Sequence, residues 1–527
     1  MMKKKIKTKA KNKKSDRKRA IDKNAKDIMA WHSNSLVAIS KKRILTWKVF
    51  FAFFFVIGIL VASVFSVFLN IEARSKAEVE NIMMEKMKKK GCVADGLLSG
   101  YGTDTDSLIE MINRSECGYL HRAVETWAAP PDFDMIEKNI QKIRKSDVVI
   151  GMFLAEAINP QKKYTDSETG KKFDFSKMCK AGSTGMWGDN TCKADMNDKN
   201  YREYLIAVSK RAIDLGITSF LFGQVYMQEG ADLANSKIPE ILDGMREYAK
   251  NKNIQIVIGA QTNTISNEKY LKNFDYIEGG VGQTPSGKID EGPCDKYYGE
   301  KRGGWCWALL WNKLFSERAN NVILHLDWSG AEDDDMSVFS RMTQEDRIRT
   351  LYKFHKQFNV KGMGFLMPFL AVINPKNPIC FGPTKEFYAP DNKYTCKDED
   401  DINAIIKGTF VGNDAKFISA NIPDKMEAGK KYAISVTYSN AGEFGWSQKN
   451  NYRLGAQNPP DNVFWGLNRA DLEKEEVIEN GKTKTFTFEV TAPGKAGTFT
   501  MDWQMVNEEI EWFGEKTPAM TIVVSTP

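Results

Sequence analysis

The sequence predicts an α/β protein whose central part is a (β/α) TIM-like barrel, with an N-terminal transmembrane helix and a C-terminal all-β immunoglobulin-like sandwich. Between residues 133 and 369, six apolar strands alternate with helical segments, an order typical of a parallel sheet covered by helices. The run 49–69 has 21 residues and no charge, and about 20 apolar residues cross a bilayer as a helix. From residue 412 onward, short β-rich runs lie between Gly, Pro and Asn turns, which favours a sandwich.

A basic tail, residues 1–48, precedes the apolar run and has 17 Lys and Arg residues against three acids. Basic residues beside a span stay on the cytoplasmic side. We therefore expect a single-pass protein of the cell membrane, with its N-terminus in the cytoplasm and its main domains extracytoplasmic. A cleaved signal peptide is the competing interpretation, but its apolar region is usually only about 7–15 residues long. A Lys-rich tail can also contact nucleic acid, but a topology signal combined with attraction to anionic lipid is the favoured interpretation, so no nucleic-acid partner is predicted.

Three further segments follow the predicted span. Residues 70–90 have helical spacing without Pro or Gly, so we predict a stalk over 70–91. The barrel domain is expected over 92–405. Its first part, 92–131, is interpreted as a loop-rich segment that packs onto the alternating region. The sandwich is expected over 412–527.

The alternating region gives the barrel prediction its detail. The predicted helices cover 133–145, 201–216, 239–253, 267–274, 306–319 and 343–359. The predicted strands cover 147–158, 217–229, 254–262, 275–284, 321–330 and 360–369. They are continuous apolar runs, as parallel strands buried on both faces are. An open doubly wound sheet also fits this order, but no GxGxxG follows the first strand. Polar and acidic residues end several strands instead, and barrels build their active sites there.

Cysteine usage indicates disulfides. Eight cysteines all lie beyond the apolar run: Cys92, Cys117, Cys179, Cys192, Cys294, Cys306, Cys380 and Cys396. An even number outside the membrane suits an oxidising compartment. Pairing of neighbours along the chain would close short loops, although sequence alone does not fix the connectivity. The rival interpretation, a zinc site, lacks a CxxC motif and tetrahedral ligand spacing, so neither a metal nor a cofactor is predicted.

Acids at strand ends suggest glycoside cleavage. This reaction uses one protonated carboxyl to release the leaving group and one ionised carboxylate as nucleophile or water activator. Glu278 and Asp327 directly end apolar strands and form the best pair, with Glu229 as the third candidate and Glu156 as the fourth. Each acid could instead cap a helix or pair with a lysine.

Flat aromatic surfaces pack against sugar rings, while amides and acids bind hydroxyl groups. The candidates for substrate contact are Trp305, Trp328, Trp187, Gln224, Gln261, Asn263 and His325. His325 shares a strand face with Asp327, because same-face residues are two apart. The alternative for His325 is a buried side chain bonded to the backbone. Trp307 and Trp311 are spaced as a packing stripe on a helix.

The C-terminal region carries a family resemblance. The segments NAGEFGWSQKNNYRLGAQNPPDNVFWGLNRADL and VTAPGKAGTFTMDWQMVNEEIEWFGE resemble the four-tryptophan immunoglobulin-like domain, whose four tryptophans match Trp446, Trp465, Trp503 and Trp512. The resemblance covers residues 416–524. It implies an accessory module used for binding or spacing.

The whole architecture is similar to cell-surface glycoside hydrolases with accessory β-domains. We therefore predict a membrane-anchored hydrolase of cell-wall or extracellular polysaccharide. A non-catalytic glycan-binding or adhesion protein on a degenerate barrel is the alternative. A surface scaffold that recruits protein partners through the sandwich also fits, because barrels host many functions.

Overall fold

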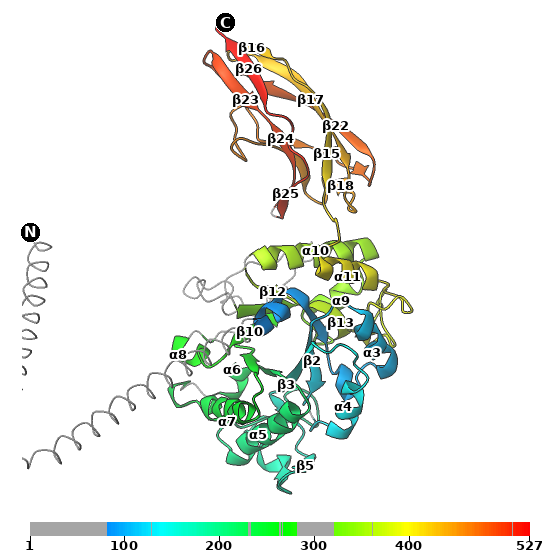
Figure 1. Ribbon diagram of the computed structural model, residues 1–527, viewed down its shortest axis with the longest axis vertical. Coiled ribbons are helices and arrows are strands. Elements are labelled where there is room, and N and C mark those ends of the chain that lie inside the picture. Colours follow the sequence, from blue (N-terminus) through cyan, green and yellow to red (C-terminus); the bar gives the residue numbers. More distant parts are fainter. Residues whose placement is uncertain are drawn as a thin grey trace, which may run out of the picture. The chain divides into compact units, whose positions relative to one another are not determined.

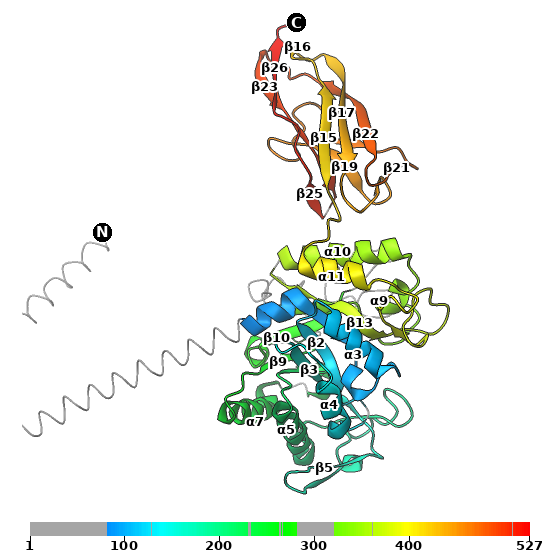
Figure 2. The same cartoon turned by 45° about the vertical axis from the view of Figure 1, so that its right-hand side comes forward.

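The computed structural model describes residues 82–127, 129–229, 233–262, 265, 267–281, 321–360, 362–508 and 510–527. All of them belong to one compact unit, Val79–Pro527. Figure 1 and Figure 2 show its helices and strands in two views.

Eight parallel strand positions close into a barrel. The sheet runs through β1 (Gly91–Ala94), β2 (Tyr119–Glu125), β3 (Val149–Leu154), β8 (Ser219–Phe222), β9 (Val257–Ala260), β10 (Tyr276–Gly280), β11 (Val322–His325), β12 (Gly364–Phe365) and β13 (Met367–Val372). β12 pairs with β11, and β13 pairs with β1, both in parallel. Only Leu366 separates β12 from β13, so these two segments act as one strand that joins the first strand to the seventh. The predicted α/β barrel is therefore confirmed.

Helices connect the strands and cover the outside of the barrel (Figure 1). They are α3 (Thr105–Arg114), α4 (Phe133–Ile140), α5 (Lys199–Asp214), α7 (Ile238–Asn251), α8 (Glu268–Leu271), α10 (Gln344–Val360) and α11 (Glu399–Lys407). In α7, Ile238, Ile241, Leu242 and Met245 are buried, which is the i, i+3, i+4, i+7 stripe of a helix with one apolar face. α7 packs beside α5 on the outer layer.

Shorter elements decorate the loops. They are β4 (Ala157–Ile158), β5 (Lys163–Thr165), β6 (Lys172–Asp174), β7 (Cys192–Lys193), β14 (Phe387–Tyr388), α6 (Val225–Gln228), α9 (Asp335–Phe339) and the 3₁₀ turns Leu97–Ser99, Phe175–Lys177 and Leu233–Asn235. β4 pairs with β7, and β5 pairs with β6. The insertion between β3 and α5 is therefore folded.

The segment 92–131 corrects the sequence interpretation. It supplies β1, α3 and β2, the first two barrel strands and the helix between them, and is not merely a loop-rich cover. β1 has only four residues, and β2 reads YLHRAVE. β1 is apolar but short, and polar His121 and Arg122 interrupt β2, so neither shows the long apolar run by which the other strands were found.

The predicted stalk needs a similar correction. Residues 82–90 are helical and lead directly into β1, but Met84 and Met87 on this helix are buried. The Lys88 ammonium group donates to the Gly362 carbonyl oxygen (3.3 Å). This part of 70–91 therefore packs on the barrel; residues 70–81 fall outside the described ranges.

The predicted location in the cell membrane is corrected. Among the residues that the structure describes, no helix has the length and apolar character needed to cross a bilayer. The predicted span 49–69 and the tail 1–48 lie outside these residues.

Disulfides join cysteines that are neighbours along the chain. The bonds are Cys92–Cys117, Cys179–Cys192 and Cys380–Cys396. The first ties β1 to the residues just before β2, where both cysteines are fully buried. Disulfide formation is thus confirmed for these six residues. Cys294 and Cys306 lie outside the described part of the chain.

The structure changes to all-β after α11. The strands form one sheet of β15 (Ala415–Asn421), β17 (Lys431–Asn440) and β22 (Thr483–Thr491), a second of β16 (Lys425–Glu427), β26 (Met520–Ser525) and β23 (Gly497–Met501), a third of β20 (Arg469–Asp471), β19 (Tyr452–Ala456), β24 (Trp503–Asn507) and β25 (Glu511–Phe513), and the pair β18 (Trp446–Ser447) with β21 (Val477–Ile478). Burial alternates along β17, with Ile434, Val436 and Tyr438 inside, as in a strand with one face on a core. The β-rich C-terminal region is confirmed; the four-tryptophan family stays a prediction.

Candidate active site

A cavity of about 570 Å³ lies at the carboxyl ends of the barrel strands. The residues singled out from the sequence that line it are Glu156, Glu278, Asp327, Trp187, Trp328, Gln224, Gln261 and His325. Active sites of (β/α) barrels form at this end because loops after several strands converge there. The cavity is therefore the candidate active site.

Three predicted site residues are not at this cavity. Glu229 is absent from its lining; its Oε1 accepts hydrogen bonds from Ser236 Oγ (2.5 Å) and Tyr270 Oη (3.3 Å). Glu229 thus holds the loop before α7 and is not brought to the other acids. Asn263 and Trp305 lie among residues that the structure does not describe.

Glu278 is held by two histidines inside the barrel. Its Oε1 lies 3.2 Å from His121 Nε2 and 2.5 Å from His325 Nε2, and all three side chains are at most 3% exposed. Burial alone would raise the pKa of Glu278, but the charge and hydrogen bonds of the histidines outweigh it and the pKa is lowered. Glu278 is therefore an ionised carboxylate at neutral pH.

The hydrogen-bond partners assign the histidine protons. His325 Nδ1 lies 2.9 Å from the Leu326 carbonyl oxygen, which only accepts, so Nδ1 carries a proton. Its Nε2 lies 2.5 Å from Glu278 Oε1. Burial lowers the pKa of His121 to about 4. Neutral His121 donates from Nε2 to Glu278 and accepts at Nδ1 from Tyr119 Oη (2.8 Å).

Glu156, just after β3, has the opposite environment. Burial raises its pKa to about 7. Its Oε1 accepts a hydrogen bond from Gln224 Nε2. Its Oε2 lies against Gly223, where a Cβ would be only 2.1 Å away, so a larger residue at 223 would displace this carboxyl.

Gln224 and Gln261 orient Glu156 as well as lining the cavity. The Gln261 side-chain oxygen accepts from the Gln224 backbone N–H (3.1 Å), and Tyr226 Oη donates to Gln224 Oε1 (3.0 Å). With its Oε1 occupied, the Gln224 amide is fixed so that its NH₂ group faces Glu156. Gln224 itself has φ 28°, a backbone strain of the kind that concentrates at functional sites.

Of the five acids that line the cavity, Asp327 is the one that is partly exposed. Burial of its carboxyl raises the pKa to about 6, with the charge of His325 opposing the shift. Its backbone is fixed by the start of α9: Asp327 N–H donates to Asp335 Oδ2 (3.1 Å), and Met336 N–H donates to the Asp327 carbonyl (2.9 Å). Asp334 caps α9 through the Ser337 N–H (2.7 Å). The acidic loop 333–335 therefore positions Asp327.

The sequence did not reveal a second group of cavity residues, which come from β1, β2 and the loops after them: Asp95, Tyr101, Arg122, Glu125 and Trp127. Arg122 Nε donates to Glu125 Oε1 (2.8 Å), and its guanidinium lies over the Phe153 ring (3.7 Å to the centroid). Burial raises the pKa of Glu125 well above its ordinary value. The sequence held one signal for strand β2: Tyr119 and His121 are two residues apart, a spacing that places two polar rings on one face of a strand.

Aromatic side chains line the outer part of the cavity. Trp187, on the insertion after β3, meets Trp127 edge to face, with ring centroids 6.1 Å apart. Both are half-buried. Trp328 lies deeper, is 7% exposed and packs 4.1 Å from the His325 ring. Two partly exposed indoles beside buried acids are suited to a sugar, which has apolar faces and polar edges.

Several buried polar atoms of the cavity have no hydrogen-bond partner among the described residues. They are Asp95 Oδ1, Glu125 Oε2, Glu156 Oε2, Glu278 Oε2, Asp327 Oδ2, Trp328 Nε1 and His325 Nε2, which is close to Glu278 without the alignment of a hydrogen bond. Leaving such a group unsatisfied costs about 1–3 kcal/mol, and native proteins keep few of them. Their concentration at one cavity indicates a site whose ligand supplies hydrogen-bond donors and at least one acceptor.

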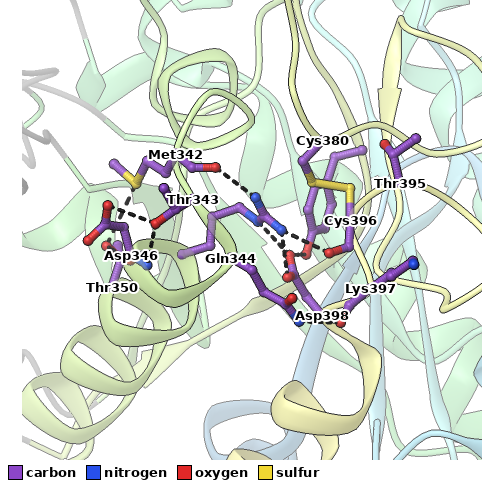
Figure 3. Close-up of polar contacts among 12 residues, drawn as sticks. Met342, Thr343, Gln344, Asp346, Thr350, Cys380, Thr395, Cys396, Lys397 and Asp398 are labelled. Carbon is purple, nitrogen blue, oxygen red and sulfur yellow. Dashed lines mark hydrogen bonds and ion pairs between the residues drawn. A yellow bond between two sulfur atoms is a disulfide. The ribbon is translucent and has the colours of Figure 1, made fainter. Parts of the chain in front are cut away.

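One described cluster has the residue types of a metal site: Cys380, Cys396 and Asp398. The two sulfur atoms are joined to each other. Asp398 accepts from Arg347 Nε (2.7 Å), Arg347 Nη2 (2.8 Å) and Tyr388 Oη (2.9 Å) (Figure 3). The atoms of this cluster that could coordinate a metal are thus already engaged, the sulfurs in a disulfide and the Asp398 oxygens in hydrogen bonds.

No protein-family model matches the chain, and no curated protein matches it. Among solved structures, the chain is similar to a GH27 β-L-arabinopyranosidase from Geobacillus stearothermophilus, with 8% identity over 78% of this chain and 99% of that one, and a TM-score of 0.34. It is also similar to a cyclic α-maltosyl-(1→6)-maltose hydrolase from Arthrobacter globiformis (8% identity, 75% and 92% covered, TM-score 0.40). A third similar structure is a maltogenic α-amylase from Thermotoga neapolitana, with 10% identity over 76% of this chain and 97% of that one, and a TM-score of 0.37. These three neighbours are glycoside hydrolases.

Proposed function

We propose that the chain hydrolyses glycosidic bonds of a glycan, with Glu278 as the ionised carboxylate and Glu156 as the proton donor. The observation that carries this proposal is the opposite shift of two carboxyl pKa values at one cavity: Glu278 is lowered by two histidines, and Glu156 is raised to about 7 by burial. Environments that push two carboxyl pKa values apart assign an acid and a base, and glycoside cleavage needs one of each.

In this mechanism the Glu156 carboxyl gives its proton to the leaving glycosidic oxygen. The Glu278 carboxylate, through its unpaired Oε2, attacks the anomeric carbon or takes a proton from the attacking water. His121 and His325 hold Oε1 and keep the charge in place. Trp127 and Trp187 would pack on sugar rings. Asp327, whose pKa is raised to about 6, is the competing candidate for the donor.

The test measures released reducing ends across a panel of polysaccharides with the wild type and the single variants Glu278→Gln, Glu156→Gln and Asp327→Asn. Removing a group that transfers a proton lowers kcat by about 10²–10⁴-fold. We expect losses of this size for Glu278→Gln and Glu156→Gln, and none for the control Glu137→Gln, whose carboxyl pairs with Arg211 outside the cavity. Full activity of both cavity variants on a cleaved substrate would refute the assignment.

The pH profile of kcat/KM in the same assay separates the two donors. A proton donor must be protonated, so activity falls as pH rises through its pKa. The alkaline limb is expected near pH 7 with Glu156 as donor, and near pH 6 with Asp327. If the alkaline limb of the pH profile belongs to Glu156, the variant Glu156→Gln should lack it.

A glycan-binding protein without turnover is the second candidate. It is favoured by the burial of Glu156 and Glu278, which are 0% and 6% exposed and so offer little access to an attacking water. Binding of a glycan that is never cleaved, abolished by Trp187→Ala, would support this function. In either case the C-terminal sheets would serve as an accessory module.

A further inference from the structure

Arg122 is an unusual residue for the interior of a parallel barrel. It lies in the middle of β2 with φ 54°, a left-handed conformation that costs a non-glycine residue about 1–3 kcal/mol. The ladder between β2 and β3 is irregular over the same residues, between Leu120 and Val124. This irregularity turns the arginine, which lines the cavity, away from the regular strand pattern.

The guanidinium of Arg122 is fixed on its faces and on one edge. Its Cζ lies over two rings, 3.7 Å from the Phe153 centroid and 5.0 Å from the Trp328 centroid. Its Nε donates to Glu125, and its Nη2 is 3.6 Å from Asp95 Oδ1, too far for a hydrogen bond. The N–H groups on Nη1 and Nη2 therefore have no hydrogen-bond partner among the described residues, although the side chain is only 14% exposed.

From this geometry we infer that the cavity recognises an acidic glycan, in which a carboxylate on the sugar binds the Nη1 and Nη2 groups of Arg122. A planar guanidinium with two neighbouring N–H groups matches a carboxylate in a bidentate pair. The inference rests on the proposed function and adds the substrate class. The two flanking rings keep the guanidinium in one orientation, so little freedom is lost on binding.

The other charges of the cavity are compatible with an anion. Besides Arg122 and the tyrosines Tyr101 and Tyr226, the titratable groups that line it are Asp95, Glu125, Glu156, Glu278, His325 and Asp327. The Glu278 carboxylate lies against His121 and His325. Burial raises the pKa of Glu125 well above its ordinary value, of Glu156 to about 7 and of Asp327 to about 6. Raised pKa values favour the neutral forms of these three carboxyls, so their repulsion of a bound anion is weakest in mildly acidic solution.

The test compares two ligands that differ in one group. A uronic-acid oligosaccharide and the same oligosaccharide after reduction of its carboxylates to alcohols are titrated by calorimetry into the full-length protein at pH 5.5. A hydrogen-bonded charge pair predicts about ten- to a hundred-fold tighter binding of the acidic form. Added salt should weaken binding of the acidic form only.

Arginine variants locate the effect. Arg122→Gln should remove the preference for the acidic form. Arg144→Gln, which removes a charge from an exposed pair with Glu110, should keep it. Equal weakening of both ligands by Arg122→Gln would make Arg122 a positioning residue and overturn the inference.

The wild-type comparison stands even if Arg122→Gln does not fold. Equal or tighter binding of the reduced glycan, or tighter binding of an amino-sugar oligosaccharide, overturns the acidic substrate class but leaves glycoside hydrolysis standing. Cleavage and binding of no glycan of any kind would overturn both proposals.

Discussion

The barrel buries two clusters of charge, and they differ in how fully their polar atoms are paired. In the first, Arg347 on α10 donates twice to Asp398 and also to the carbonyl oxygens of Met342 and Cys396 (2.8 and 2.9 Å) (Figure 3). Tyr388 completes the shell of Asp398. No side-chain atom of Arg347 or Asp398 is among the buried unpaired atoms of the described residues. This cluster joins α10 to the loop of the Cys380–Cys396 disulfide.

The second cluster lines the cavity and is incompletely paired. Glu125, Glu156, Glu278 and Asp327 each keep one buried oxygen without a hydrogen bond among the described residues. Fully satisfied buried networks hold a fold in one arrangement, whereas partly satisfied ones cost free energy. The difference teaches that buried charge has two uses in this barrel: the Arg347 cluster serves stability, and the cavity cluster keeps bonding capacity for a ligand.

The largest expected effect breaks the paired cluster. Asp398→Ala leaves Arg347 buried without its partner, and removing one member of a buried pair costs about 3–5 kcal/mol. The free energy of unfolding in urea should fall by this amount, while kcat of the folded protein stays unchanged. The control, Glu110→Ala, removes the exposed pair with Arg144 and should cost less than about 1 kcal/mol. A loss of kcat without a loss of stability would mean that the two clusters do not have separate uses.

The next variant, Glu156→Gln, is expected to raise the free energy of unfolding at alkaline pH. The folded-state pKa of Glu156 is about 7, above its ordinary 4.5, so the folded protein binds more protons than the unfolded chain between these values. The free energy of unfolding therefore falls as pH rises from about 4.5 to about 7 and then levels off. Glu156→Gln should remove this fall and stabilise the protein at pH 8 by at most about 3 kcal/mol.

The matched variant at the other carboxyl sharpens this test. The pKa of Glu278 is lowered by its histidines, so the folded state favours its charged form. Glu278→Gln should therefore destabilise the protein at pH 8, where Glu156→Gln stabilises it. Unfolding curves at pH 5 and pH 8 measure both. Equal behaviour of the two variants would show that the two carboxyls do not have opposed environments.

The sequence predicted most strands of the barrel, but it did not predict which inward side chains contact one another. Strands β3, β8, β9, β10 and β11 are apolar runs, and the acids after them were found because burial of a parallel strand is visible in composition. Strand β2 escaped because its inward residues, Tyr119 and His121, are polar and find partners on other strands: His121 Nε2 lies 3.2 Å from Glu278 Oε1 of β10, and Ser219 Oγ of β8 donates to Tyr119 Oη (3.3 Å). Such pairing depends on the strand opposite, which no local pattern contains.

The same limit applies within the site. Glu278 was singled out as a strand-end acid, but its partner His121 comes from β2 on another part of the chain. Glu229 and Glu156 had equivalent sequence signals. They differ because the side chain of Glu229 turns to Ser236 and Tyr270, while Glu156 lies against Gly223 at the cavity. Their backbone positions differ too: the predicted strand 217–229 ends at Phe222, so Glu229 follows the short helix α6, whereas Glu156 comes directly after the end of β3.

The smallest expected effect concerns two disulfides, one near each of the two clusters. Cys380–Cys396 lies beside the paired cluster, and Cys179–Cys192 closes the loop that carries Trp187 toward the cavity. Replacing Cys179 and Cys192 by Ser should free this loop and raise KM about three- to ten-fold with little change in kcat, because lost binding common to ground and transition states appears in KM.

Two variants complete the comparison of the disulfides. Trp187→Ala should raise KM by a similar factor, and adding it to the Cys179/Cys192 double variant should have little further effect, because both act through one indole and their effects are not additive. Replacement of Cys380 and Cys396 by Ser should lower the melting temperature and leave KM unchanged. If the Cys179/Cys192 variant instead lost stability and kept its KM, the insertion would be part of the barrel's support, and the aromatic wall of the cavity would have to be assigned to Trp127 alone.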